Sequence, residues 1–309
     1  MTRHFLDIAE VPPAVPPQLV QQGLRMKAKP KLGRGWLADK VVAMIFEKPS
    51  TRTRTSFEVG ICQLGGHPMV LKSDDMQLGR GETIADTARV LAGYADAIMI
   101  RCSHHETLTE LADYSSVPVI NGLTDRSHPC QVMADVMTMA EQAGSLEAIK
   151  GWKVAWFGDG NNVAVSWIEA AAVFGFTLCL ATPPALRPPA EVIEAARASG
   201  AKLQLTDDAA EAADAAAVMV TDTWSSMGMP GGYSNSGDRQ QLLRPFQINS
   251  RIMARALPDA FFMHCLPVYR GQEATADVVD GPQSVIWQEA NNRLHVQKAI
   301  LAWALAAID

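Results

Sequence analysis

The 309-residue sequence lacks any uninterrupted apolar run close to the ~18 residues that a membrane-spanning helix needs. The segment Met1–Pro17 carries Arg3 and His4 but lacks the apolar core of a secretory signal peptide. These absences predict a chain that has no contact with a membrane and that is located in the cytoplasm.

Basic charge is also scarce, because 27 Lys and Arg residues face 33 Asp and Glu residues, giving a net charge of −6. A protein that binds nucleic acid generally carries a basic surplus, so we expect no nucleic-acid partner. A small anionic ligand remains compatible with this balance, because a few clustered cations can dominate the local field.

Cysteine is sparse, and none of the cysteines shows C-x-x-C spacing. Their odd number and wide separation argue against a disulfide framework and against a structural zinc site. We expect most of them to be buried, and we expect neither a metal ion nor a cofactor. The cysteines are Cys62, Cys102, Cys130, Cys179 and Cys265.

Common nucleotide signatures are missing too. The chain has no G-x-x-x-x-G-K-[ST] segment, and Gly158-Asp159-Gly160 lacks the third glycine of a dinucleotide fingerprint because Val163 stands there. A lone G-x-G is weak evidence, so a nucleotide-dependent dehydrogenase is retained only as an alternative, which predicts tight binding of a dinucleotide.

The sequence does contain an alternation of short apolar runs and longer amphipathic segments from about residue 41 onward. Near-continuous apolar strands separated by helices are typical of parallel sheets covered on both faces. The length suits two domains of roughly 150 residues. We predict an α/β protein with two domains, each a mainly parallel sheet flanked by helices. The expected strands are residues 41–46, 69–71, 97–100, 117–120, 153–157, 177–180, 202–205, 217–220 and 260–263.

Other boundaries can be placed from composition. A helix is expected to begin at Pro129, and the halves are expected to separate near residues 143–145. The last helix, about Glu289 to Ala307, is apolar enough to pack on a core. The segment Gly228–Asp238 contains four Gly, one Pro and two Ser, which favours a mobile loop that is either a connector or a lid.

Three cations, Lys48, Arg52 and Arg54, surround the point where the first strand gives way to its helix. A cation at a helix N-terminus interacts unfavourably with the helix dipole and destabilises the helix by roughly 0.3–1 kcal/mol. Three such cations together therefore indicate a compensating function. An anionic ligand supplies one, because free backbone N–H groups, the dipole and the cations all attract it. A solvated basic face is the alternative. The nearby Ser50, Thr51 and Thr53 add hydroxyl donors and one candidate N-cap.

Residues 46–54, Phe-Glu-Lys-Pro-Ser-Thr-Arg-Thr-Arg, resemble the carbamoyl-phosphate motif of the aspartate/ornithine carbamoyltransferases. Three further segments resemble motifs of that family in the same order: residues 128–131 (His-Pro-Cys-Gln), 222–228 (Asp-Thr-Trp-Ser-Ser-Met-Gly) and 264–267 (His-Cys-Leu-Pro). The resemblance covers nearly the whole chain, and four ordered motifs are highly specific. The last two are most similar to the ornithine branch.

The resemblance implies two α/β domains with the active site in the cleft between them. Residues 1–143 with the C-terminal helix 289–309 would bind carbamoyl phosphate, and residues 144–288 would bind ornithine. It also implies a homotrimer in which Gln77 completes the site of a neighbouring subunit. The implied reaction converts carbamoyl phosphate and L-ornithine into L-citrulline and phosphate, with ordered binding and domain closure, within arginine metabolism.

In such a reaction negative charge develops on the carbonyl oxygen while phosphate leaves, so catalysis depends mostly on positioning and electrostatics. His128 precedes Pro129, which suits the first position of a helix, and Gln131 follows in the first turn. The resemblance assigns catalysis to Arg52, Arg101, His128, Asp222 and Cys265. It assigns carbamoyl-phosphate binding to Ser50, Thr51, Arg52, Thr53, Arg54, Gln77, Arg101, His128, Gln131, Cys265, Leu266 and Arg293.

Several of these residues also have ordinary structural interpretations. Arg101 could be a surface arginine at a strand exit, and Arg293 a surface charge that caps a helix. Cys265 and Leu266 end an expected strand, where parallel sheets place ligands, but a cysteine there can equally be a buried thiol. The Leu266-Pro267 segment resembles a cis peptide of the family.

A zwitterionic amino acid needs a carboxylate for its ammonium group and donors for its carboxylate. Asp222, Ser226, Asn162 and the Met227 backbone N–H supply these groups, so they form the expected ornithine site. The ornithine side-chain amine, with a pKa near that of lysine at about 10.4, must lose a proton before it attacks. Asp222 and Cys265 are both candidates to favour that loss.

Two segments depart from the family pattern: residues 229–234, Met-Pro-Gly-Gly-Tyr-Ser, follow the Ser-Met-Gly motif, and Val268-Tyr269-Arg270 follow the His-Cys-Leu-Pro motif. The alternatives are a sister carbamoyltransferase acting on putrescine, N-acetylornithine or aspartate, and a non-catalytic relative that serves as a regulatory or binding protein. A non-catalytic relative would be expected to lose some of the residues assigned to the reaction. This sequence retains all of them: Arg52, Arg101, His128, Gln131, Cys265 and Arg293.

Overall fold

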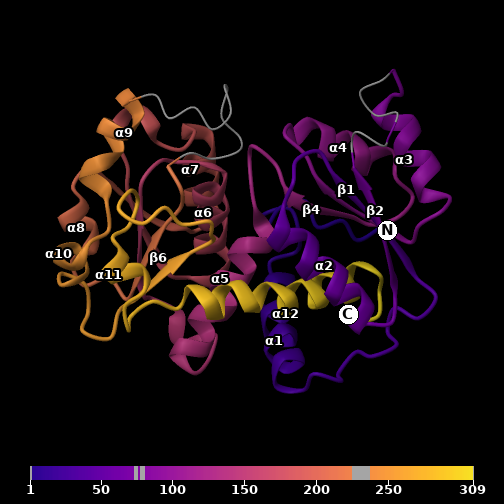
Figure 1. Cartoon of the computed structure of the whole chain (residues 1–309), viewed down its shortest axis with the longest axis horizontal. Coiled ribbons are helices and arrows are strands. Elements are labelled where there is room, and N and C mark those ends of the chain that lie inside the picture. Colours follow the sequence, from indigo (N-terminus) through magenta and orange to yellow (C-terminus); the bar gives the residue numbers. More distant parts are fainter. Residues whose placement is uncertain (1, 73–75, 77–80, 225–236, 309) are drawn as a thin grey trace. The chain divides into compact units, whose positions relative to one another are not determined.

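The computed structural model describes residues 2–72, 76, 81–224 and 237–308. The chain folds into two compact units (Figure 1). Unit 1 comprises Met1–Met137 with Asn291–Asp309, and unit 2 comprises Thr138–Ala290. Both divisions fall inside helices, the first in α5 (Pro129–Ala143) and the second in α12 (Ile286–Ala304). The boundary expected at residue 143 is the last residue of α5.

Unit 1 is built on a parallel sheet in the order β2-β1-β3-β4. The central strands are apolar and buried because helices cover both faces, as the unbroken apolar runs predict. The strands are β1 (Val41–Phe46), β2 (His67–Lys72), β3 (Ala97–Arg101) and β4 (Val119–Leu123).

One face of this sheet packs on α3 (Ile84–Ala92) and α4 (His105–Tyr114), which share a buried cluster with β1 and β3. Elsewhere in unit 1, α1 (Val15–Ala28), α2 (Thr51–Gln63) and α12 approach one another closely through glycines. A Cβ on Gly60 of α2 would lie 3.2 Å from the Lys298 side chain of α12, and a Cβ on Gly23 of α1 would lie 3.2 Å from the Val296 backbone. Glycine therefore sets the helix spacing that holds the C-terminal helix against unit 1.

Unit 2 contains a second parallel sheet, in the order β7-β6-β5-β8-β9. Its strands are β5 (Lys153–Phe157), β6 (Thr177–Ala181), β7 (Lys202–Thr206), β8 (Val218–Thr221) and β9 (Phe261–His264). Its helices are α6 (Asn162–Phe174), α7 (Ala190–Ala198), α8 (Ala209–Ala213), α9 (Gly237–Leu243), α10 (Ser250–Met253) and α11 (Ala276–Val279).

The faces of this second sheet differ. Helices α8, α10 and α11 share a buried apolar cluster with the strands, centred on Phe157, Met219 and Phe262. Helix α6, which is buried along most of its length, packs against α7, β6 and β7. The alternation of strand and helix predicted from the sequence is therefore confirmed in both units.

Every strand expected from the sequence overlaps an observed strand. Within the loop expected at Gly228–Asp238, residues 228–236 lie outside the described part of the chain. The expectation is wrong for its last two residues, because Gly237 and Asp238 already belong to α9. In the parts of the chain that the structure describes, no helix combines the length and apolarity needed to span a bilayer.

Candidate active site

Both sheets have a topological switch point, where neighbouring strands send the chain toward opposite edges. In unit 1 this point lies between β1 and β3, and in unit 2 between β5 and β8. Open parallel sheets bind ligands beyond the carboxyl ends of the strands at such points. The residues predicted from the sequence lie there: Arg52 and Arg101 follow β1 and end β3, and Asn162 and Asp222 follow β5 and β8.

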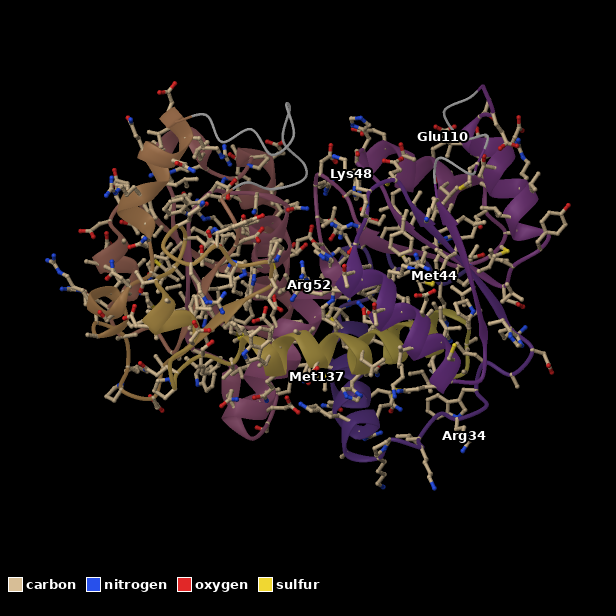
Figure 2. The ribbon with its side chains drawn as sticks, in the orientation of Figure 1. Arg34, Met44, Lys48, Arg52, Glu110 and Met137 are labelled. Atoms are coloured by element: carbon tan, nitrogen blue, oxygen red, sulfur yellow. The ribbon has the colours of Figure 1, made fainter. Side chains whose placement is uncertain are left out.

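The N-terminus of α2 has the geometry of an anion site. Ser50 is the N-cap, in extended backbone, and its hydroxyl accepts a hydrogen bond from the Thr53 N–H at 3.4 Å. The expected N-cap is confirmed. Lys48 and Arg52 lie on the segment that leads from β1 into α2 (Figure 2). Backbone N–H groups and cations therefore gather at one helix end, which favours a bound anion.

Two buried guanidinium groups converge on the Thr53 hydroxyl. Arg101 Nη1 lies 3.4 Å from Thr53 Oγ1, and Arg293 Nη2 donates to the same oxygen at 2.9 Å. Arg101 is 7% exposed and Arg293 is 3% exposed, so neither is the surface residue of the alternative interpretation. Burying two cations side by side is costly unless an anion or acceptor compensates them. This arrangement is what a phosphate site requires.

Gln131 is held in a defined orientation in the first turn of α5. Its Oε1 accepts from Arg293 Nη1 at 3.0 Å, and its Nε2 donates to Asp135 Oδ1 at 2.8 Å. Asp135 is 1% exposed and lies one helical turn beyond Gln131. The pair of bonds fixes which end of the Gln131 amide faces each partner. Sequence reasoning missed Asp135, although its i,i+4 spacing from Gln131 on a helix is a usable signal.

His128 lies at the N-terminus of α5, immediately before Pro129, as predicted. Burial lowers the pKa of His128 well below its ordinary value of 6.5, and the charges of Arg293, Arg101 and Arg52 lower it further. The side chain is therefore a neutral imidazole at pH 7. A neutral imidazole can donate one N–H to a carbonyl oxygen without adding a fourth positive charge to the cluster.

This lowered pKa makes the stability of the fold depend on pH. The unfolded chain binds a proton at His128 near pH 6.5, whereas the folded chain resists it. Protonation of His128 therefore favours the unfolded chain below pH 6.5. The free energy of unfolding is highest above that pH and decreases as the pH falls below it. Urea denaturation between pH 8 and pH 5 should show a smaller loss of unfolding free energy for His128→Asn than for the parent. The exposed His104→Asn variant should match the parent, and equal slopes for all three proteins would contradict the assignment.

Arg54, another predicted carbamoyl-phosphate residue, makes an ion pair of its own. The Arg54 guanidinium forms an ion pair with Glu58 one turn along α2, at 3.2 Å, and its side chain is 46% exposed. Gln77 lies outside the described residues. Among the described residues predicted to bind carbamoyl phosphate, those that lie together in unit 1 are the cap of α2, Arg52, Arg101, Arg293, His128 and Gln131.

In unit 2, the Asp222 carboxylate accepts hydrogen bonds from several directions. Oδ1 accepts from the Thr223 N–H at 2.7 Å, and Oδ2 accepts from Asn161 Nδ2 at 2.8 Å. Asn161 has no freedom to turn its amide over, because its Oδ1 caps α6 by accepting the N–H groups of Val163 and Ala164. Asn161 was missed by sequence reasoning, which named its neighbour Asn162, a buried residue that begins α6.

Cys265 completes this group at the end of β9. Its thiol donates to Asp222 Oδ1 at 3.0 Å, so the two candidates for assisting amine deprotonation are in contact. The following residue, Leu266, has φ near +60° and joins Pro267 through the cis peptide bond that the resemblance predicted. Ser226 and Met227 lie outside the described residues.

A second carboxylate lies beside Asp222. Burial raises the pKa of Asp159 to about 7, Asp222 adds to this, and the guanidinium of Arg239 opposes it. Arg239 contacts Asp159 Oδ2 and also donates to the Trp224 carbonyl at 3.2 Å. This arginine therefore ties the turn after β5 to the turn after β8, the two turns that carry Asn161 and Asp222.

A metal ion is not required by the donor set. Ligand atoms of Asp222, His264 and Cys265 approach one another within 4.8 Å, a spacing that a metal could use. However, His264 Nδ1 accepts the Leu266 N–H at 2.9 Å, and its Nε2 lies 3.3 Å from Glu273. Both ring nitrogens of the histidine therefore already face other groups.

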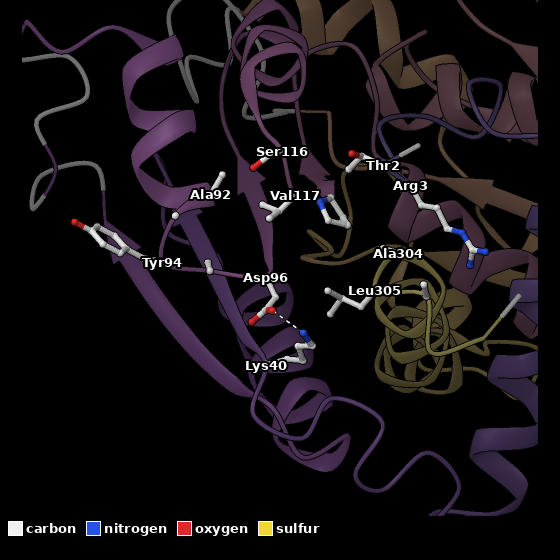
Figure 3. Close-up of a pocket in the computed structure, with 14 residues that line it drawn as sticks. Thr2, Arg3, Lys40, Ala92, Tyr94, Asp96, Ser116, Val117, Ala304 and Leu305 are labelled. Carbon is white, nitrogen blue, oxygen red and sulfur yellow. Dashed lines mark hydrogen bonds and ion pairs between the residues drawn. The ribbon is translucent and has the colours of Figure 1, made fainter.

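A pocket of about 660 Å³ lies at the opposite end of the unit 1 sheet, where β1, β3 and β4 begin (Figure 3). Lys40 and Asp96, which line it, form an ion pair at 2.8 Å. Because α/β sheets place their chemistry at the carboxyl ends of strands, this pocket is separate from the candidate active site.

The pattern of the whole chain matches known proteins. Residues 3–141 match the family described as aspartate/ornithine carbamoyltransferase, carbamoyl-P binding domain, and residues 150–304 match its Asp/Orn binding domain. The chain belongs to the aspartate/ornithine carbamoyltransferase family. The match to the second domain extends to the last residue of α12, yet Arg293 of that helix belongs to unit 1 and bonds Gln131 and Thr53 there.

Individual relatives agree with this assignment. An ornithine carbamoyltransferase of Rhodopseudomonas palustris (strain BisA53) is 53% identical over 99% of this chain and 98% of its own length. One from Roseobacter denitrificans is 52% identical over 98% of this chain and 99% of its own length. The structure of ornithine carbamoyltransferase from Pyrococcus furiosus has a TM-score of 0.92 and 45% identity, covering 100% of this chain and 98% of its own. As a family member the chain is a transferase.

Proposed function

We propose that this chain transfers the carbamoyl group of carbamoyl phosphate to the side-chain amine of L-ornithine, releasing L-citrulline and phosphate. The observation that carries the first substrate is the convergence of buried Arg101 and Arg293 on Thr53 beside the N-terminus of α2. The choice of amine is supported by Asp222 with Cys265 and by the names of the relatives from R. palustris and R. denitrificans.

The phosphate is held at the start of α2. Backbone N–H groups and the hydroxyls of Ser50, Thr51 and Thr53 donate to its oxygens, and the guanidinium groups of Arg52 and Arg101 neutralise its charge. Arg54 adds longer-range positive charge to the same helix end. Because these groups are fixed before the substrate arrives, they stabilise the charge of the leaving phosphate without reorganising.

The carbamoyl carbonyl is polarised by neutral donors and cations. The His128 imidazole donates an N–H to the carbonyl oxygen, Gln131 contacts the carbamoyl amide, and Arg293 adds positive charge. As the amine nitrogen bonds to the carbonyl carbon, negative charge grows on that oxygen, and these groups stabilise it. The bond from carbon to the phosphate oxygen then breaks, and its electron pair leaves with phosphate.

Ornithine is bound by groups of unit 2. Asn162, Ser226 and the Met227 backbone N–H bind its α-carboxylate and ammonium groups together with the Asp222 carboxylate. The attacking amine must lose one proton, and Asp222 or Cys265 favours that loss. The Leu266 carbonyl accepts a hydrogen bond from the reacting groups. This division of labour predicts that substitutions in unit 2 change the kinetics of ornithine more than those of carbamoyl phosphate.

We also propose a cytoplasmic homotrimer that serves arginine biosynthesis, in which Gln77 reaches the site of a neighbouring subunit. Mixing inactive Arg52→Ala chains with inactive Gln77→Ala chains would then restore part of the activity, because some hybrid sites carry both native residues. Sedimentation would give the number of subunits, and the absence of any restored activity would contradict shared sites.

The test of the proposed function is the amine used. With carbamoyl phosphate supplied, we expect turnover of L-ornithine and formation of citrulline, with little turnover of putrescine, N-acetylornithine or aspartate. N-acetylornithine is the most informative competitor, because an N-acetyl-L-ornithine transcarbamylase structure has a TM-score of 0.87 at 33% identity. Turnover of another amine without turnover of ornithine would overturn the proposal. No turnover of any amine would favour a non-catalytic relative.

A further inference from the structure

A completely buried histidine and glutamate lie behind Cys265. His264, the last residue of β9, is 1% exposed, and Glu273 is 0% exposed. His264 Nε2 lies 3.3 Å from Glu273 Oε1. On the other side of the ring, Nδ1 accepts the backbone N–H of Leu266 at 2.9 Å.

These contacts define the protonation of the His264 ring. A backbone N–H only donates, so Nδ1 must present a lone pair to Leu266. In the neutral ring the proton then resides on Nε2, which lies 3.3 Å from Glu273 Oε1 but forms no hydrogen bond among the described residues, so the carboxylate favours this tautomer through its nearby charge alone. If the proton moved to Nδ1, two N–H groups would oppose each other and the bond to Leu266 would be lost.

The bond to Leu266 matters because it borders the candidate active site. Leu266 has φ near +60°, a conformation that a side chain other than glycine adopts only when its surroundings enforce it. On the other side of Cys265, the His264 backbone N–H donates to Glu289 Oε2 at 2.8 Å. Cys265 is thus held between two anchored neighbours, with its thiol 3.0 Å from Asp222 Oδ1.

Glu273 itself is fixed in position. Its Oε1 accepts the Tyr269 N–H at 2.6 Å, whereas its Oε2 has no hydrogen-bond partner among the residues that the structure describes. A buried carboxylate with an oxygen left unsatisfied is costly. Glu273 Oε1 thus lies against both the Tyr269 N–H and His264 Nε2, so this one side chain borders both ends of the segment that contains Cys265 and Leu266.

We propose that Glu273 is a positioning residue for the carbamoyl transfer: through the His264 tautomer it holds the Leu266 backbone and therefore sets Cys265 against Asp222. This role in catalysis rests on the proposed function. The contacts that define the tautomer are independent of it.

The test uses Glu273→Gln, which keeps the size of the side chain and an acceptor for Tyr269 but removes the charge that faces His264. With ¹⁵N-labelled histidine, NMR of the parent should show a protonated Nε2 and an unprotonated Nδ1 for His264. In Glu273→Gln we expect a mixture of tautomers. An unchanged tautomer in this variant would overturn the proposal.

Cysteine reactivity gives a second readout that needs no turnover. In a Cys62→Ser background, which removes the exposed thiol, Cys265 is the remaining cysteine that is not buried. We expect the pH profile of its alkylation by iodoacetamide to shift in Glu273→Gln, because its distance from Asp222 changes. An unshifted profile would mean that Glu273 only pins Tyr269, and would overturn the proposal.

Kinetics then connect these signatures with the reaction. In Glu273→Gln, kcat/KM for ornithine should fall about tenfold through misplacement of the reacting groups, while KM for carbamoyl phosphate stays within about twofold. In a His264→Asn background, where the amide oxygen accepts the Leu266 N–H without proton control, Glu273→Gln should have no further effect. Additive losses would overturn the proposal. If the NMR and alkylation signals change but the parent carbamoylates no amine, the proposed function is wrong, while the link from Glu273 to Cys265 is retained.

Discussion

An Arg52→Ala variant should lose about three orders of magnitude in kcat/KM for carbamoyl phosphate, or roughly 4 kcal/mol of transition-state stabilisation. Arg52 lies in the first turn of α2, where backbone N–H groups and its guanidinium would act on the proposed phosphate. Arg101 and Arg293 do not replace Arg52, because both are held by the Thr53 hydroxyl and neither lies in the first turn of α2. Initial-rate measurements with carbamoyl phosphate varied at saturating ornithine would give this loss.

Two comparisons make this result specific. Arg34 is exposed in unit 1, and its side chain is shown in Figure 2, so Arg34→Ala should keep parental kinetics and thermal stability. Arg52 is also one of the cations that lower the pKa of His128, so that pKa should rise in Arg52→Ala. A variant that retained full activity, or an unchanged pKa of His128, would show that Arg52 faces away from the site.

The fold was largely predictable because its signal is local. Each buried parallel strand appears in the sequence as a short apolar run, for example residues 41–46 and 153–157, and each run is followed by a helical segment. The order of strands within each sheet was not predictable in the same way. It depends on which helices cover which face, and that information is spread over residues far apart in the chain.

The residues of the candidate site also fall into two groups, those marked by local sequence signals and those that depend on distant partners. Ser50, Arg52 and His128 lie at element boundaries that the sequence marks with capping residues and proline, so their positions were predictable. Asn161 and Glu273 were missed, because each acts through a partner that only the folded chain brings near. Glu273 reaches His264 across a loop of irregular backbone, which leaves no periodic pattern in the sequence.

An Asp222→Asn variant should lose about three orders of magnitude in kcat/KM for ornithine, again roughly 4 kcal/mol. The carboxylate accepts from the Thr223 N–H, from the Cys265 thiol and from Asn161 Nδ2. An asparagine places an NH₂ group against one of these donors. Asn161 is unable to turn over to accept it, because its own Oδ1 caps α6. The substitution therefore removes the charge and also disrupts the site.

The matched control is Asp259→Asn, an exposed aspartate of the same unit, which should leave the kinetics and the free energy of unfolding unchanged. For Asp222→Asn, KM for carbamoyl phosphate should stay within about twofold, since the residues proposed to bind phosphate belong to unit 1. An equal loss with both substrates would instead indicate unfolding of the site. An Asp222→Asn enzyme with parental kcat/KM for ornithine would assign the deprotonation of the amine to Cys265 alone, because the thiol would then act without its carboxylate partner.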